Sequence, residues 1–143
     1  MLFRWLFASR IGYVPGVPII AIVDDDVSIR AATDRFVRSL GLISRTFASA
    51  EDFLHSSCLH ETSCVLADVH MPGMSGIDLQ DHLLSLGHPV PIVFITAFPE
   101  VSVRARALNS GAVCFLSKPY DGPTMARCID AALSRRNAGS SDN

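Results

Sequence analysis

Short apolar runs alternate with segments of helical periodicity along most of the chain. Residues 19–23 form a continuous, mostly β-branched run, which is typical of a strand buried on both faces of a sheet. Between such runs, apolar residues recur every three or four positions, and this spacing is typical of amphipathic helices. Five strands are predicted in this way, at residues 19–23, 43–47, 64–67, 91–95 and 112–116.

The alternation of strands with helices indicates a doubly wound α/β domain, with a five-stranded parallel sheet, helices on both faces and right-handed crossovers. The run at 43–47 is more polar than the others, so we expect it at a sheet edge. The first, third and fourth strands belong in the middle. These preferences are compatible with the flavodoxin-like strand order 2-1-3-4-5, which the sequence alone leaves open.

The predicted domain occupies residues 19–136 and is flanked by two segments of different composition. Residues 1–18 are expected to form a disordered N-terminal extension that ends at a Pro- and Gly-rich boundary. Two alternatives stay open for this extension: a weak membrane-surface helix, in which arginines lie beside aromatic residues, or translation from a start codon placed too far upstream. Residues 137–143 are polar and rich in Ser, which predicts a flexible tail.

Composition excludes several classes of protein. The 143 residues are 49% hydrophobic with a formal net charge of −2, which argues against a disordered chain and against direct nucleic-acid binding. No apolar run approaches the roughly 18 residues of a membrane span, so we expect a cytoplasmic protein. The four cysteines lack the spacing of a zinc site. Cys64 and Cys114 lie in apolar runs, where buried, reduced thiols are expected.

Polar side chains follow four of the five predicted strands. The carboxyl ends of parallel strands meet at one edge of a sheet, where open α/β folds bind ligands. Clustered carboxylates repel one another unless a cation intervenes, and Mg²⁺ commonly takes one or two carboxylates, waters and a phosphate oxygen. A lysine and a threonine hydroxyl complement a phosphoryl group. The residues are Asp24, Asp25 and Asp26 after the first strand, Asp68 after the third, Thr96 after the fourth and Lys118 after the fifth.

Each of these residues also has an ordinary structural interpretation. Asp26 suits the N-cap of the following helix, Asp68 could cap a turn, and Lys118 could be a solvated surface lysine. However, Lys118 is the only lysine among twelve basic residues, and a guanidinium fork does not replace a compact ammonium. The convergence of acidic, hydroxyl and ammonium groups at one edge favours a functional site.

Four motifs carry a resemblance to a known family. They are Ile22-Val23-Asp24-Asp25-Asp26, the stretch LADVHMPGMSG from Leu66 to Gly76, Ile95-Thr96-Ala97, and Phe115-Leu116-Ser117-Lys118-Pro119-Tyr120. On these motifs, residues 18–135 resemble the receiver domain of bacterial two-component response regulators. The stretch from Val90 to Gly122 is most similar to the FixJ-type branch of that family.

The resemblance implies a phospho-acceptor and a metal site. Asp68 would accept the phosphoryl group, with Mg²⁺ (or Mn²⁺) as the cofactor. The metal ligands implied are Asp24, Asp25, Asp68 and the backbone carbonyl of His70.

Further roles at the same edge follow from the resemblance. Thr96 and Lys118 would each bind a phosphoryl oxygen, and the peptide bond before Pro119 would be cis. Phe115 occupies the position of the family's switch aromatic, although plain packing of the strand also explains it. His70 and Phe98 flank the approach of a hydrolytic water, so their identity is expected to tune the lifetime of the phosphorylated state.

The function implied is phosphorelay signal transduction rather than turnover of a separate substrate. Asp68 would be phosphorylated by a sensor histidine kinase and would lose the group by slow autodephosphorylation. The added charge would bias a two-state equilibrium at the face built from the fourth helix, fifth strand and fifth helix, which changes partner binding. A phosphorylation-dependent homodimer is one form that this switching can take. The effector or output domain stays unidentified.

Two other classes of protein fit part of the pattern. A haloacid-dehalogenase-like phosphatase would use Asp24 and Asp26 as its Asp-x-Asp motif, with Asp24 as the nucleophile, but it leaves Asp68 without a role. A flavodoxin-like flavin binder needs a Ser-, Thr- and Gly-rich first loop, and the three consecutive aspartates would repel its phosphate.

Overall fold

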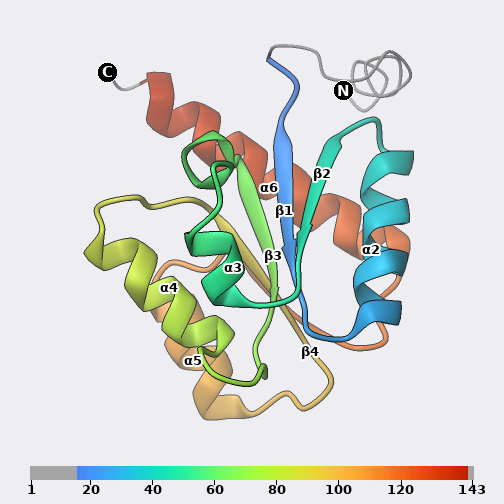
Figure 1. The fold of residues 1–143 in the computed structure, drawn as a ribbon, viewed down its shortest axis with the longest axis vertical. Coiled ribbons are helices and arrows are strands. Elements are labelled where there is room, and N and C mark those ends of the chain that lie inside the picture. Colours follow the sequence, from blue (N-terminus) through green and yellow to red (C-terminus); the bar gives the residue numbers. More distant parts are fainter. Residues whose placement is uncertain (1–15, 142–143) are drawn as a thin grey trace.

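The computed structural model describes residues 16–141, with side chains through Arg136, as a parallel five-stranded sheet between two layers of helices (Figure 1). The strand order is β2-β1-β3-β4-β5, which confirms the predicted order and fold class. The polar second strand lies at an edge, as predicted. The strands are β1 (Ile19–Val23), β2 (Ile43–Phe47), β3 (Cys64–Asp68), β4 (Ile92–Thr96) and β5 (Cys114–Ser117).

The helices connect the strands in the predicted alternation. Asp26 is the N-cap of the first helix, where its carboxylate accepts hydrogen bonds from the backbone N–H groups of Ser28 and Ile29. A short 3₁₀ helix, η2, lies in the connection to β3 and was not predicted. The helices are α2 (Val27–Ser39), α3 (Ala50–Leu54), η2 (Leu59–Glu61), α4 (Gly76–Ser85), α5 (Val101–Asn109) and α6 (Gly122–Ser141).

The two predicted flanking segments have different outcomes. Most of the predicted extension, residues 1–15, lies outside the described residues. At the other end, α6 continues through Ser141, beyond the predicted domain boundary at 136. Arginine and alanine are good helix formers and no proline interrupts the segment, while a single glycine costs only about 1 kcal/mol relative to alanine. Flexibility of residues 137–143 stays a prediction.

Two hydrophobic clusters, one on each face, enclose the sheet. On one face α3, α4 and α5 contribute residues such as Phe53, Leu79 and Ala107. On the other face α2 and α6 contribute residues such as Val37 and Ile129. Side chains alternate along each strand between the two clusters, so β1 and β3 are buried throughout. The middle strands are therefore clamped from both sides.

The strand register brings the polar residues together. Val23 of β1 is paired with Ala67 of β3, so Asp24 and Asp68, each one residue later, leave adjacent strands at the same level. Thr96 of β4 is paired with Ser117 of β5, immediately before Lys118. The predicted convergence at one edge of the sheet is a direct consequence of this register.

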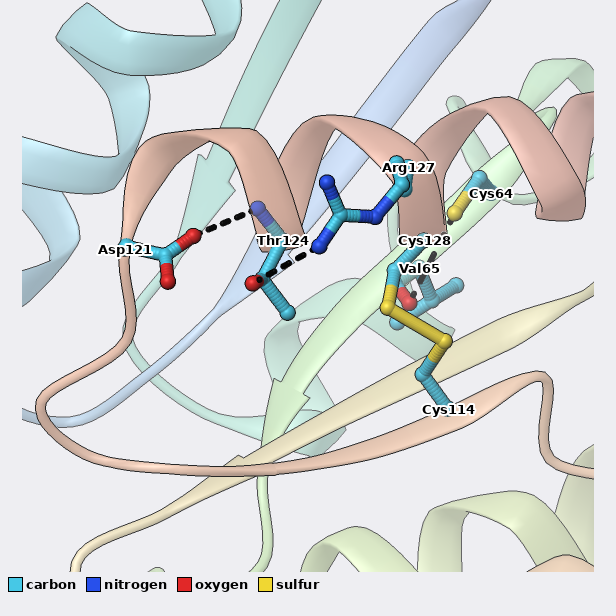
Figure 2. Close-up of a disulfide and its surroundings, with 7 residues drawn as sticks. All are labelled: Cys64, Val65, Cys114, Asp121, Thr124, Arg127 and Cys128. Atoms are coloured by element: carbon cyan, nitrogen blue, oxygen red, sulfur yellow. Dashed lines mark hydrogen bonds between the residues drawn. A yellow bond between two sulfur atoms is a disulfide. The ribbon is translucent and has the colours of Figure 1, made fainter.

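A disulfide corrects one prediction about the cysteines. Cys114 of β5 is joined to Cys128 of α6, with their Cα atoms 6.1 Å apart, so the predicted reduced state of Cys114 is wrong (Figure 2). The bridge depends on the packing of α6 against β5, which the spacing of the cysteines does not reveal. Cys64 is free and buried, as predicted, and burial raises the pKa of its thiol to about 12.

Within the described residues 16–141, no helix is both long and apolar enough to cross a bilayer.

Candidate functional site

Asp24 is held in place by the loop that follows β1. Its backbone N–H donates to the carbonyl of Phe47 over 3.1 Å, and its Oδ1 accepts from the N–H of Asp26 over 2.9 Å. The guanidinium of Arg30 donates to the Asp24 carbonyl over 2.7 Å. Only 5% of Asp24 is exposed, and this burial raises the pKa of its carboxyl group above the ordinary value.

Asp68 ends β3 and lies at the entrance to a tight turn. Its Oδ1 accepts a hydrogen bond of 3.1 Å from the backbone N–H of His70. The chain then returns, and the Gly76 N–H donates to the carbonyl of Val69 over 2.9 Å. A Cβ atom at Gly76 would collide with the backbone carbonyl of Asp68, so only glycine allows the turn to close this tightly.

Three carboxylates form one cluster. Oxygen atoms of Asp24, Asp25 and Asp68 all lie within 4.8 Å of one another, with Asp24 and Asp68 buried and Asp25 exposed. An all-oxygen donor set with one side open to water fits a hard divalent cation that keeps part of its hydration shell. The cluster therefore satisfies the chemistry predicted for Mg²⁺ or Mn²⁺.

Lys118 reaches this cluster from β5. Its Nζ lies 3.1 Å from Oδ2 of Asp68 and 3.4 Å from Oδ2 of Asp24. Burial alone would lower the pKa of Lys118, but the hydrogen bond to Asp68 and the charges of both aspartates outweigh it and raise the pKa. The ammonium is therefore firmly charged at neutral pH. The peptide bond from Lys118 to Pro119 is cis.

Thr96 is the remaining site residue at the carboxyl ends of the strands. It is fully buried at the end of β4, and its Oγ1 accepts a hydrogen bond of 3.1 Å from the N–H of Phe98. Its backbone carbonyl accepts from the N–H of Lys118 over 2.8 Å, which ties the two strand ends together. The Thr96 hydroxyl hydrogen is free for another acceptor, since Oγ1 is the acceptor in the bond to Phe98.

Three residues form a rim beside the acidic cluster. The rings of His70 and Phe98 have centroids 6.2 Å apart in an edge-to-face arrangement. His70 Nε2 lies 3.9 Å from a carboxylate oxygen of Glu100. Phe98 is 72% exposed, so a large apolar ring stands in solvent next to the site.

Phe115 lies further inside, on β5. It is partly buried against the cluster shared with α5, and its ring centroid is 6.2 Å from that of Phe94. This is the position that the sequence assigns either to a switch aromatic or to strand packing, and the packing is plainly present.

Sequence reasoning missed two supporting contacts. Glu51 on α3 accepts a hydrogen bond of 3.2 Å from the N–H of Met74, which anchors the turn after Asp68. Tyr120, next to Pro119, lies with its hydroxyl 3.3 Å from that of Thr33 on α2. Both contacts join residues distant in sequence, and no local pattern signals either one.

Comparison with known proteins places this site in a family. A family model for the response regulator receiver domain matches residues 20–130. Nodulation protein W of Bradyrhizobium diazoefficiens is 39% identical over 117 residues, which is 82% of this chain and 52% of that protein. The chain thus spans about half the length of the curated relatives it matches.

Comparison with solved structures indicates the same family. The response regulator StyR superposes with a TM-score of 0.79 at 36% identity, covering 89% of this chain and 66% of StyR. The structure named FixJ-N gives a TM-score of 0.74 at 28% identity, covering 82% of this chain and 94% of that chain. The phosphatase and flavin-binder alternatives are thereby set aside. This chain belongs to the response regulator receiver domain family of two-component systems, with FixJ among its relatives.

Proposed function

We propose that this domain carries out phosphorelay by accepting a phosphoryl group from a sensor histidine kinase on Asp68, in a reaction that requires Mg²⁺ or Mn²⁺. The observation that carries the proposal is the position of the Asp68 carboxylate, with Lys118 Nζ at 3.1 Å and two further aspartates beside it. A strand-end carboxylate in contact with both a cationic side chain and a cation-binding cluster is suited to attack phosphorus.

The metal ligands proposed are the carboxylates of Asp24, Asp25 and Asp68 together with the backbone carbonyl of His70. When bound, the divalent cation would supply Lewis-acid stabilisation of phosphoryl oxygens. Asp24 and Asp68 are held by backbone N–H donors, so the site is preorganised before the cation arrives. The raised pKa of Asp24 supports the same assignment, because a buried carboxylate gains most from a nearby cation.

The transfer conserves the phosphoryl group. A carboxylate oxygen of Asp68 attacks the phosphorus of a kinase phosphohistidine, the P–N bond breaks, and its electrons leave with the imidazole nitrogen. Lys118 offsets the charge on one phosphoryl oxygen, and the Thr96 hydroxyl donates to another. Lys118 Nζ already lies beside Asp68 and Asp24, so it is close to the carboxylate that accepts the phosphoryl group.

The output follows from the new charge beside Thr96. Movement of the Thr96 hydroxyl toward the acyl phosphate opens space into which Phe115 can turn, and this biases the face formed by α5, β5 and α6. We propose that the effector, the output domain or a second copy of this chain binds that face. Direct nucleic-acid binding is not part of the proposal.

His70 and Phe98 are proposed to set the lifetime of the phosphorylated state. The domain would turn over no separate substrate, and loss of the phosphoryl group would proceed by attack of water on phosphorus. The rim of His70, Phe98 and Glu100 lies beside the turn that carries Asp68, so it limits how water enters.

The test is intact mass after incubation with Mg²⁺ and acetyl phosphate. Wild type is expected to gain one phosphoryl group, and chelation of the metal should prevent it. Asp68→Asn should gain none, whereas Asp52→Asn, an exposed carboxylate on α3, should behave as wild type. An adduct that survives Asp68→Asn but disappears in Asp24→Asn would overturn the assignment and revive the phosphatase alternative. Folded, metal-binding wild type without an adduct would contradict the proposal as well.

A further inference from the structure

The disulfide lies within the face proposed to switch. Cys114 begins β5 and Cys128 lies in the second turn of α6, with a sequence separation of 14 (Figure 2). The bridge therefore joins two of the three elements of that face covalently. Cys114 is partly exposed, whereas Cys128 is buried in the cluster under α6.

The segment enclosed by the bridge carries the machinery of the site. Between the two cysteines lie Phe115, Lys118 and Tyr120. Beyond them, the Asp121 carboxylate accepts from the N–H of Thr124 over 2.7 Å, which fixes the first turn of α6. The lysine loop is thus a short connection between a strand and a helix that are bonded to each other.

Cys114 and Phe115 are neighbours with opposite surroundings. Cys114 packs with the cluster under α6, and Phe115 packs with the cluster under α5. Phe115 directly follows Cys114 in β5, so a displacement of the β5 backbone that accompanies a change at Phe115 also acts on the bridge to α6.

We propose that reversible reduction of the Cys114–Cys128 disulfide controls how readily phosphorylation rearranges the α5–β5–α6 face; this rests on the proposed function. In the reduction, a thiolate of an external dithiol attacks one sulfur of the bridge, the S–S bond breaks and a mixed disulfide forms. The second thiolate of the reagent then releases the protein sulfur. The bridge has taken up two electrons and two protons, and the dithiol has become a disulfide.

The oxidised form is the restrained one. A disulfide holds its two Cα atoms within roughly 4.4–6.8 Å, and the observed 6.1 Å lies toward the upper end of that range. Separation of α6 from β5 is therefore blocked in the oxidised form and becomes available after reduction. Linkage makes the effect reciprocal, because a ligand that favours the rearranged face also favours the reduced cysteines by the same factor.

Cys64 does not compete with external thiols for exchange with the bridge. Cys64 on β3 belongs to the same hydrophobic cluster as Cys128 and is drawn with the bridge in Figure 2, but it is fully buried and its thiol pKa is raised to about 12. A protonated thiol is a poor nucleophile, so internal exchange with the bridge is suppressed. Control of the bridge therefore belongs to external thiols that reach the partly exposed Cys114 end.

The experiment measures the affinity of Mg²⁺-loaded protein for beryllium fluoride, a tetrahedral analogue of the phosphoryl group, in both redox states. We expect the reduced protein to bind it at least about fivefold more tightly than the oxidised protein. A Cys114→Ala, Cys128→Ala double variant should match the reduced protein and ignore added dithiol. Cys58→Ala, which leaves the bridge intact, should respond to dithiol as wild type does.

Two outcomes overturn this inference. One is equal affinity in the two redox states while the Asp68 adduct still forms, which leaves the proposed function intact. The other is unfolding of the reduced wild type, seen by circular dichroism, which would make the bridge a structural staple only. Failure of Asp68 to be phosphorylated in either redox state is a separate result that removes the proposed function itself.

Discussion

The central strands β1 and β3 and the edge strand β5 contribute different residues to the site, and they are buried to different degrees. β1 and β3 are buried along their whole length, and they carry the two buried aspartates, Asp24 and Asp68. β5 is only partly buried, and it carries Lys118. Rigid strands fix the groups that must be preorganised for a cation and a phosphoryl group. The partly buried edge strand leads into the lysine that contacts both aspartates.

The disulfide lies at the less buried of these two regions. The central strands pair with a neighbouring strand on each side, whereas β5 pairs with β4 alone. The bridge from Cys114 to Cys128 adds a covalent link with α6 to the packing of β5 against both hydrophobic clusters. The two regions therefore differ in what holds them: full burial at the centre, and partial burial together with a covalent link at β5.

Truncation of matched leucines should give the largest effect on stability. Leu66 in β3 is 1% exposed, and Leu116 in β5 is only partly buried. Leu66→Ala is expected to lower the free energy of unfolding by about 4 kcal/mol, because a fully enclosed cavity remains. Leu116→Ala should cost about half of that or less. Urea unfolding of both variants measures the difference, and equal losses would remove the contrast between centre and edge.

Reduction of the disulfide should come next in size. Closing a loop of about 15 residues is worth about 3 kcal/mol through the entropy of the unfolded chain, so reduced protein should unfold at a lower urea concentration by that amount. Cys58→Ala without dithiol serves as the control and should unfold as wild type. A change below about 1 kcal/mol would mean that packing already holds β5 in place.

Removal of the ammonium should slow the reaction while leaving the fold intact. Lys118→Ala is expected to reduce the rate of phosphorylation by acetyl phosphate about a hundredfold, as loss of one preorganised donor does elsewhere. The rate for Lys118→Arg should lie between the rates for wild type and Lys118→Ala, because the planar guanidinium cannot occupy the space of a compact ammonium. Time-resolved intact mass measures the rates, with circular dichroism to confirm folding. A wild-type rate in Lys118→Ala would show that the lysine does not assist phosphoryl transfer.

Neutralisation of Asp24 should give the smallest effect, and its sign should depend on the metal. Burial raises the pKa of Asp24, so the folded state binds this proton more tightly than the unfolded state does. The contribution of Asp24 to the free energy of unfolding therefore grows as the pH falls through the folded-state pKa toward the ordinary value of 3.8. At pH 7, the charged and buried carboxylate of Asp24 lowers the stability of the folded state.

Asp24→Asn is thus expected to raise the urea midpoint slightly in metal-free protein at pH 7. With saturating Mg²⁺ the order should reverse, because only the wild type keeps its full set of ligands. Asp52→Asn should move neither midpoint. A lower midpoint for Asp24→Asn in the absence of metal would show that its bond to Lys118 outweighs its burial.

Much of the site was accessible from the sequence because its signals are local. An apolar run that ends at Asp68, a Gly-rich turn and a single lysine before Pro119 can all be seen within a few residues. Parallel strands then place their carboxyl ends at one edge, so the convergence of these groups follows from the fold class. The polar run at 43–47 indicated one edge of the sheet, but the full order of the five strands came from the structure.

Other features depend on contacts between distant segments. The hydrogen bond from Met74 to Glu51 and the pairing of Tyr120 with Thr33 join elements that no sequence period relates. The disulfide is of the same kind, because only the seating of α6 on β5 brings Cys114 and Cys128 within bonding distance. The extent of α6 to Ser141 was not predicted either, since a polar, Ser-rich composition does not by itself break a helix.

By itself, the sequence determined which strands are central, which residues end them and which chemistry those residues offer, because hydrophobic periodicity and turn residues act over short distances. Only the tertiary structure decided that Lys118 contacts Asp68 and Asp24 together, and that the lysine loop is enclosed by a covalent bridge. The reason is physical: burial pattern fixes which face a residue takes, whereas side-chain contacts and sulfur pairing depend on how whole elements pack against one another.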